Sequence, residues 1–113
     1  MAYQPLDFFV MKDLLSEEEI LIRDTTRKFV DKEVMPVIAE QWEAGTFPKD
    51  MIPKLAELGV LGPFVPAKYG GAEASYTTYG LICQELERGD SGVRSFASVQ
   101  GSLVMYPIWK FGS

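Results

Sequence analysis

The chain has 113 residues, a length that suits one ordinary domain with a single hydrophobic core. Apolar residues make up 47% of it and charged residues 24%, spread along its length, which excludes a disordered tail or a collagen-like repeat. The net charge of −5 excludes a nucleic-acid surface, and the lack of histidine removes the commonest metal ligand and the commonest general base.

Residues 1–14 combine Pro5 with the pair Phe8-Phe9 and show no clear period. We predict an extended N-terminal arm that docks through its aromatic side chains. The first residues lack a basic stretch followed by an apolar run, and nowhere are there about eighteen consecutive apolar residues. We therefore expect no membrane segment and a cytoplasmic location by default, although a mitochondrial matrix protein with its transit peptide removed would look the same.

A capping box predicts that the first helix begins after Ser16, because Glu19 stands three positions further on. Side chains that can pack on one side then recur at helical spacing: Ile22, Thr26, Phe29, Val30, Val34, Val37 and Ile38. Pro36 should end or kink this helix just before it, unless the helix bends and resumes as far as Trp42.

A shorter helix is expected from Phe47 to Leu58, with Pro48 in its first turn and Gly59 as the residue that ends it. The next stretch, residues 59–74, is rich in glycine and proline but also carries apolar side chains. We predict a loop that packs against the body of the protein.

Ser75 is placed to cap a third helix. The spacing assigns four residues to its inner face and three to its outer end: Tyr79, Ile82, Cys83 and Leu86 inside, and Glu85, Glu87 and Arg88 outside. Because Cys83 is the single cysteine, no disulfide can form within the chain, and we expect it to pack in the core.

Residues 84–100 concentrate charged and small side chains between two strongly apolar stretches. Gly89 and Gly92 relax the backbone there, and Asp90 and Ser91 can accept hydrogen bonds from the free amides of a following helix. We predict a helix-turn-helix elbow that carries Glu87, Arg94 and Ser95.

A fourth helix is expected from Gly92 towards Ser102, followed by a fifth helix or a continuation bent at Pro107. No alternating β-branched run is bounded by hairpin turns, so the fold class is all-α with four or five helices. Gly112-Ser113 has the form of a helix stop followed by a new N-cap, which suggests a chain cut at a helix boundary. In that case an interface is expected from Met105, Tyr106, Ile108, Trp109 and Phe111; the alternative is a natural C-terminus with these residues in the local core.

Spacing alone leaves two interpretations of Arg94. It stands four positions after Asp90, as in an ordinary surface ion pair, and seven after Glu87, which lets those two share a helix face. Alternatively, Arg94 lies beside Ser95 and Ser98 and faces a cavity, where its planar fork holds a carboxylate in bidentate fashion.

Two stretches, ELGVLGPFVPAKYGGA at 57–72 and YGLICQELERGDSGVRSFASVQGSLVMYPIWKFGS at 79–113, resemble the N-terminal helical domain of the acyl-CoA dehydrogenase family, most closely its glutaryl-CoA branch. The resemblance covers residues 15–113, and the run from Glu87 to Gln100 is its specific part. It implies an enzyme whose N-terminal domain is this chain and whose middle β domain, C-terminal helical domain, catalytic base and flavin-binding segments lie elsewhere.

The resemblance also implies a reaction and the roles of several residues. FAD oxidises an acyl-CoA between its α and β carbons, and in the glutaryl branch loss of carbon dioxide then gives crotonyl-CoA. The family's arginine for the distal carboxylate corresponds to Arg94, with Ser95 as a neighbouring hydroxyl and Glu87 as the acid beside them. Three further residues would line the acyl tunnel: Ser98, Val99 and Leu103.

The partners implied by the resemblance are the acyl-CoA substrate, electron-transfer flavoprotein and three further copies in a homotetramer. The 113 residues alone are expected to be inactive, to bind no FAD and to self-associate through Trp109 and Phe111. Two alternatives remain: a non-catalytic helical interaction module in which Arg94 is a surface cation, and a family member that acts on a monocarboxylic acyl-CoA.

Overall fold

The computed structural model describes Gln4 and residues 6–113, and this part of the chain consists of helices and connecting segments without a strand. The helices are α1 (Glu17–Phe29), α2 (Met35–Ala44), α3 (Met51–Leu58), α4 (Tyr76–Gly89), α5 (Ser91–Ser98) and α6 (Tyr106–Phe111). Two π-helical segments, Val30–Val34 and Val99–Met105, join α1 to α2 and α5 to α6 without a break, and short 3-10 turns span Met11–Leu14 and Ala67–Tyr69. The all-α prediction is confirmed. Within the described residues, none of the helices is both long enough and apolar enough to cross a membrane.

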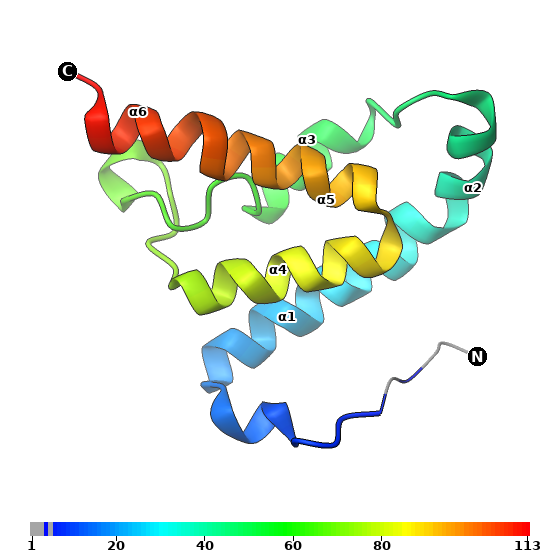
Figure 1. Ribbon diagram of the computed structural model, residues 1–113, viewed down its shortest axis with the longest axis horizontal. Helices are drawn as coiled ribbons and strands as arrows, with labels where there is room; N and C mark the ends of the chain where they lie inside the picture. Colours follow the sequence, from blue (N-terminus) through cyan, green and yellow to red (C-terminus); the bar gives the residue numbers. More distant parts are fainter. Residues whose placement is uncertain (1–3, 5) are drawn as a thin grey trace.

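The molecule is a flat wedge of 47 × 39 × 19 Å. Figure 1 shows α4 lying along α1, and α5 folding back over α4 after a sharp bend, with α3 tucked behind α5. The buried core lies between these helices and contains Val30, Val34, Met51, Leu55, Val60, Ile82, Leu86, Val93 and Ala97. The bend between α4 and α5 is therefore fixed by a packed core beneath it.

The first helix begins as the sequence predicts. The Ser16 hydroxyl accepts a hydrogen bond from the Glu19 amide at 3.2 Å, and the Glu19 carboxylate accepts one from the Ser16 amide at 2.9 Å. Pro36 does not end the helix. The chain changes to π-helical turns just before this proline, which lacks an amide donor, and then continues as α2 to Ala44.

The π turns have one structural consequence for the predicted inner face. Val30 and Val34 are completely buried, but Val37 is 39% exposed, contrary to the sequence prediction. A π-helical turn holds one residue more than the α-helical spacing assumes, so side chains that follow it are rotated out of the predicted stripe.

The region from Phe47 to Ala74 differs from the prediction in one detail. α3 begins at Met51 rather than at Phe47, whose ring packs instead against Phe96 with centroids 5.2 Å apart. Gly59 ends α3 in the left-handed region at a φ of 81°. The loop that follows packs inward, because Phe64 and Val65 are buried.

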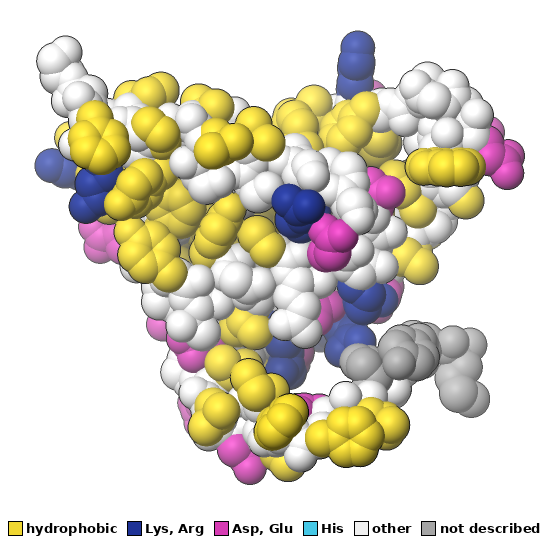
Figure 2. All heavy atoms as spheres, in the orientation of Figure 1, with side chains coloured by type: hydrophobic (Ala, Val, Ile, Leu, Met, Phe, Trp, Pro, Cys, Tyr) yellow, Lys and Arg dark blue, Asp and Glu magenta, His cyan; other side chains and the backbone are white. Residues whose placement is uncertain are grey.

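The N-terminal arm is not docked by its aromatic side chains. Phe8 and Phe9 are each 84% exposed, and Figure 2 shows apolar side chains gathered on this segment at the bottom of the molecule. Pro5, which also contributed to the prediction, lies outside the described residues. The arm extends away from the helices (Figure 1).

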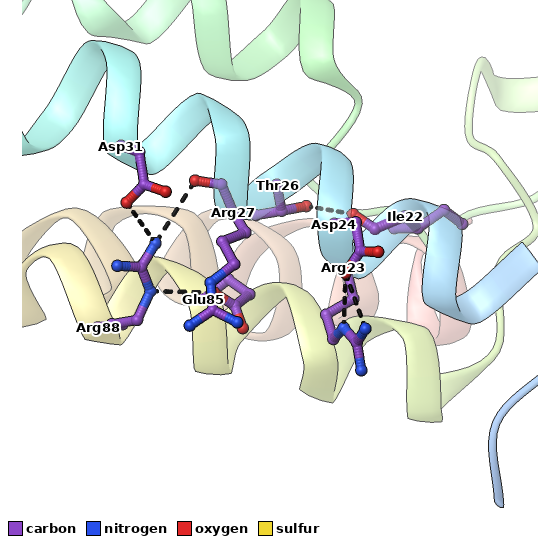
Figure 3. A network of polar contacts seen from close by, with 8 residues as sticks. All are labelled: Ile22, Arg23, Asp24, Thr26, Arg27, Asp31, Glu85 and Arg88. Carbon is purple, nitrogen blue, oxygen red and sulfur yellow. Dashed lines mark hydrogen bonds and ion pairs between the residues drawn. The ribbon is translucent and has the colours of Figure 1, made fainter. Parts of the chain in front are cut away.

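Charged residues of α1, of the π turns that follow it and of α4 form a cluster that we call the α1–α4 seam: Arg27, Asp31, Glu85 and Arg88 (Figure 3). Glu85 is only 3% exposed, although the sequence places it on the outer end of its helix. Its carboxylate lies 3.1 Å from Nε of Arg88 and 3.8 Å from Nε of Arg27, and Arg88 also donates to Asp31 at 2.8 Å. Two arginines balance the buried carboxylate, which makes its burial tolerable.

Candidate functional site

The candidate site is built on the bend between α4 and α5, as predicted, but by different backbone devices. Asp90 has an extended backbone conformation between the two helices, and its carboxylate accepts a hydrogen bond from the Val93 amide at 2.9 Å. Neither Gly89 nor Gly92 has a positive φ, so neither is required for the turn itself. Gly89 instead permits close packing, since a Cβ there would lie 2.6 Å from Cγ1 of Val30.

Four polar side chains on this bend form one hydrogen-bonded group, which we call the elbow cluster: Glu87, Ser91, Arg94 and Ser98. Nε of Arg94 donates to Oε2 of Glu87 at 2.6 Å, and Nη1 of Arg94 donates to the Ser98 hydroxyl at 3.0 Å. The Ser91 hydroxyl donates to Oε1, the other oxygen of Glu87. The Arg94 ion pair is thus with Glu87 from α4, while Asp90 is occupied as the cap of α5.

The electrostatics of the elbow cluster keep both charges in place at neutral pH. The hydrogen bond from Arg94, followed by that from Ser91, lowers the pKa of Glu87 below its ordinary value. The bond to Glu87 raises the pKa of Arg94 in turn. The Arg94 side chain remains 34% exposed and that of Glu87 45% exposed, so water and dissolved anions can reach the pair.

Two further side chains of α4 lie near Arg94, and sequence reasoning missed their part in the site. Burial raises the pKa of Tyr79 and of Cys83, and Arg94 lies near enough to act on both in the opposite sense. Cys83 is half-buried at this face and does not lie in the core as predicted. The sequence pattern that could have predicted this is a spacing of four residues, which places Tyr79, Cys83 and Glu87 along one side of α4.

The small residues of α5 and the following π turns divide between two faces. Ala97 is buried in the core, and Gly101 packs against the backbone of Gly62. Ser95 is half-buried and contributes its carbonyl oxygen, which accepts from the Ser98 hydroxyl at 3.2 Å. Within the described part of the chain, the Ser95 hydroxyl makes no hydrogen bond to the elbow cluster.

The predicted apolar wall of the acyl tunnel lies on the outside of the domain. Val99 is 46% exposed and Leu103 is 68% exposed. Apolar side chains continue from there over α6, in the upper left of Figure 2, where Ile108 and Phe111 are 67% and 84% exposed. These residues offer an uncovered apolar strip that begins one turn beyond Ser95.

Two open cavities flank this region. One of about 450 Å³ adjoins the bend and is lined by residues that include Trp42, Phe47 and Ser91. The other, of about 410 Å³, lies beside α6 against Trp109. Arg94 lies in the wall of neither cavity. Neither of them is therefore the cavity that we predicted in front of its guanidinium.

The fold and the elbow cluster together define an all-α domain with a guanidinium and hydroxyl groups on a bend next to an apolar strip. The sequence model for "Acyl-CoA dehydrogenase, N-terminal domain" matches residues 16–113. The chain therefore belongs to the acyl-CoA dehydrogenase family.

Solved structures and curated relatives agree with this family. A crystal structure of glutaryl-CoA dehydrogenase from Mycobacterium smegmatis is 49% identical, with a TM-score of 0.85 over 91% of this chain and 27% of that one. A second from the same organism, in complex with FADH2, is 44% identical, with a TM-score of 0.91 over 99% of this chain and 29% of that one. The rat (Rattus norvegicus) short-chain specific acyl-CoA dehydrogenase, a mitochondrial enzyme, is 36% identical over 88% of this chain and 24% of its own length. The chain thus spans about a quarter of the length of these relatives.

Proposed function

We propose that this chain is the N-terminal domain of an FAD-dependent acyl-CoA dehydrogenase that acts on glutaryl-CoA, and that Arg94 binds the distal carboxylate of the acyl chain. The observation that carries the proposal is the position of Arg94, held by Glu87 and Ser98 at the end of an apolar strip. The similarity to glutaryl-CoA dehydrogenase at 49% identity supports the choice of substrate.

The physical argument concerns the cost of placing a carboxylate next to apolar groups. A carboxylate that leaves water for an acyl tunnel is strongly disfavoured unless a cation and hydrogen-bond donors meet it. Arg94 supplies a planar guanidinium, which matches both oxygens of a carboxylate. Val99 and Leu103 supply exposed apolar surface for the methylene groups of the same substrate. In this proposal, Ser95 adds a hydroxyl beside the carboxylate, and Ser98 orients the guanidinium.

The chemical step belongs to other parts of the proposed full-length enzyme. FAD, when bound there, accepts a hydride from the β carbon, while a base outside these residues takes the α proton. The donor set of the elbow cluster, one guanidinium and hydroxyl groups, suits a carboxylate and does not amount to a dinucleotide site. The residues of this chain therefore bind and orient the acyl chain, and we expect the 113 residues alone to be inactive.

Partners and location follow from the same proposal. The full-length enzyme would pass electrons to electron-transfer flavoprotein and assemble as a homotetramer, and the isolated chain would self-associate through the exposed side chains of α6. The rat relative is mitochondrial, which agrees with the matrix alternative for location. The choice between matrix and cytoplasm stays a prediction.

A second candidate function is supported by the curated relatives. The rat enzyme at 36% identity is specific for short-chain substrates, so the parent of this chain could instead act on a monocarboxylic acyl-CoA. In that case Arg94 would serve only the ion pair with Glu87. The family assignment argues against the remaining alternative, a non-catalytic interaction module.

The test is to replace Arg94 by alanine in the full-length enzyme and to compare two substrates. We expect kcat/KM for glutaryl-CoA to fall at least tenfold, about 1.4 kcal/mol of transition-state stabilisation, with little change for butyryl-CoA. Arg23→Ala is the matched control, because Arg23 is another helical arginine paired with an acid, its neighbour Asp24. Equal losses on both substrates would remove the role of Arg94 in carboxylate binding.

A further inference from the structure

The two carboxylate oxygens of Glu87 have different partners. Oε2 accepts from Nε of Arg94, while Oε1 accepts from the Ser91 hydroxyl on the first turn of α5. The other hydrogen bond of the Arg94 side chain runs from Nη1 to the Ser98 hydroxyl. Neither bond of the guanidinium uses Nη2, and Nη1 has a second proton.

This division of the two oxygens matters because a guanidinium can meet a carboxylate along two edges. The side edge consists of Nε and Nη2, and the end edge consists of Nη1 and Nη2, so the two edges share Nη2. A glutamate that bound Arg94 through both of its oxygens along the side edge would consume Nη2. An incoming carboxylate would then find only part of the end edge free.

We propose that Ser91 is a positioning residue: by holding Oε1 of Glu87, it keeps this carboxylate on Nε alone and leaves the end edge of Arg94 open for the substrate carboxylate. The inference rests on the proposed function and deepens it, since Ser91 would set the affinity for dicarboxylic acyl-CoA substrates. In this arrangement Glu87 and Ser98 fix the guanidinium from two sides.

The local structure leaves the Ser91 hydroxyl available for this task. Asp90, not Ser91, caps α5, so the start of the helix does not depend on Ser91. Ser91 is exposed and does not belong to the buried core. It also lines the cavity of about 450 Å³ beside the bend.

The first test uses the chain itself and needs no substrate. In a crystal structure of Ser91→Ala, we expect Oε1 of Glu87 to turn and lie within hydrogen-bond distance of Nη2 of Arg94, about 2.7–3.2 Å. In Ser91→Thr, which keeps the hydroxyl, Oε1 should stay on residue 91. If Oε1 keeps its place in Ser91→Ala, the positioning role is wrong.

The second test uses the full-length enzyme and separates binding from chemistry. For Ser91→Ala we expect KM for glutaryl-CoA to rise about three- to tenfold, the value of one hydrogen bond, with kcat and the constants for butyryl-CoA unchanged. Ser91→Thr should restore KM. The matched control is Thr25→Ala, which removes an exposed hydroxyl bonded only to its own helix, at the Leu21 carbonyl. An unchanged KM, or equal changes on both substrates, overturns the inference.

The two proposals fail in different ways. If Arg94→Ala lowers activity on glutaryl-CoA selectively while Ser91→Ala leaves KM unchanged, Ser91 has no positioning role and the proposed function stands. If Arg94→Ala is not selective, the proposed function fails. The crystal structure of Ser91→Ala then still decides whether Ser91 holds Glu87.

Discussion

Helix α4 carries two arginine-glutamate clusters within one turn, and they differ mainly in burial. Glu85 belongs to the α1–α4 seam and is 3% exposed, whereas the side chain of Glu87 in the elbow cluster is 45% exposed. Two residues along a helix correspond to a rotation of about 200°, so these carboxylates point to nearly opposite sides. One side of α4 thus carries a buried carboxylate, and the opposite side carries an exposed one.

This difference separates a structural ion pair from one that can serve a ligand. At the seam, Arg27 and Arg88 are committed to a carboxylate that no longer has water to solvate it. Burial by itself lowers the pKa of Arg88, but its hydrogen bonds with Asp31 and Glu85 outweigh that effect and raise it. At the elbow, the guanidinium of Arg94 stays accessible. The arginines of the seam neutralise a buried carboxylate, whereas Arg94 is paired with an exposed one.

The largest expected effect on stability comes from removing the buried acid of the seam. Glu85→Ala leaves two partly buried arginines without their shared acid, and we expect the free energy of unfolding to fall by about 3 kcal/mol, the lower end for a buried pair because both guanidiniums keep some exposure. Urea denaturation measures the loss. Glu87→Ala is the matched variant on the same helix and should change stability far less. Similar losses for the two variants would contradict the comparison.

A smaller effect tests how closely the end of α4 packs against the π turns. A Cβ at Gly89 would lie 2.6 Å from Cγ1 of Val30, so Gly89→Ala should destabilise the protein by about 1–3 kcal/mol through overpacking. Gly80 is the control in the same helix, because a Cβ there meets nothing within 4 Å. Gly80→Ala should stabilise the protein by about 0.5–1 kcal/mol through helix propensity. Thermal unfolding of both variants would reveal opposite shifts, and a stabilised Gly89→Ala would refute the close contact.

The smallest expected effect concerns the dependence of the elbow on pH. The folded pKa of Glu87 is lowered below its ordinary value of 4.5, so the ionised side chain favours the folded state above that value. This contribution is lost as the pH falls through the folded pKa. The Tm of the wild type should therefore exceed that of Glu87→Gln at pH 7, and the gap should close on acidification below about 4.5. A gap that persists at pH 2 would mean that the ionised pair is not its source.

High salt gives an independent check of the same contribution. Exposed ion pairs are screened, so 1 M NaCl at pH 7 should also reduce the gap between wild type and Glu87→Gln. The decrease in stability of Glu85→Ala should depend less on salt, because the Glu85 carboxylate is buried. Equal salt sensitivity at both places would show that burial does not distinguish them.

Local signals in the sequence were sufficient for much of the fold. The capping box at Ser16, the cap at Ser75 and the glycine stop at Gly59 each depend on residues within a few positions of one another, and each forms as predicted. The bend between α4 and α5 was predicted for the same reason. Its glycines were misinterpreted, since the close approach of Gly89 to Val30 involves residues far apart in the chain.

The errors have a common physical origin in contacts distant in sequence. Glu85 looked like an outer residue because its partner Arg27 lies on another helix, and no spacing within α4 predicts that contact. The aromatic side chains of the arm were expected to dock, but a sequence pattern does not say whether a surface is within reach. In the elbow cluster, Ser91 was considered only as a cap, and its bond to Glu87 emerges from the three-dimensional bend.

The π-helical segment Val99–Met105 sets the angular relation between the polar elbow and the aromatic end of the chain. If the same residues wound as regular α-helical turns, every side chain from Tyr106 onward would be rotated by about one helical step, about 100°, around the axis. The ring of Tyr106 would then leave its edge-on contact with Phe64. The wide turns of this segment thus hold the last helix in the orientation that brings Tyr106 against Phe64.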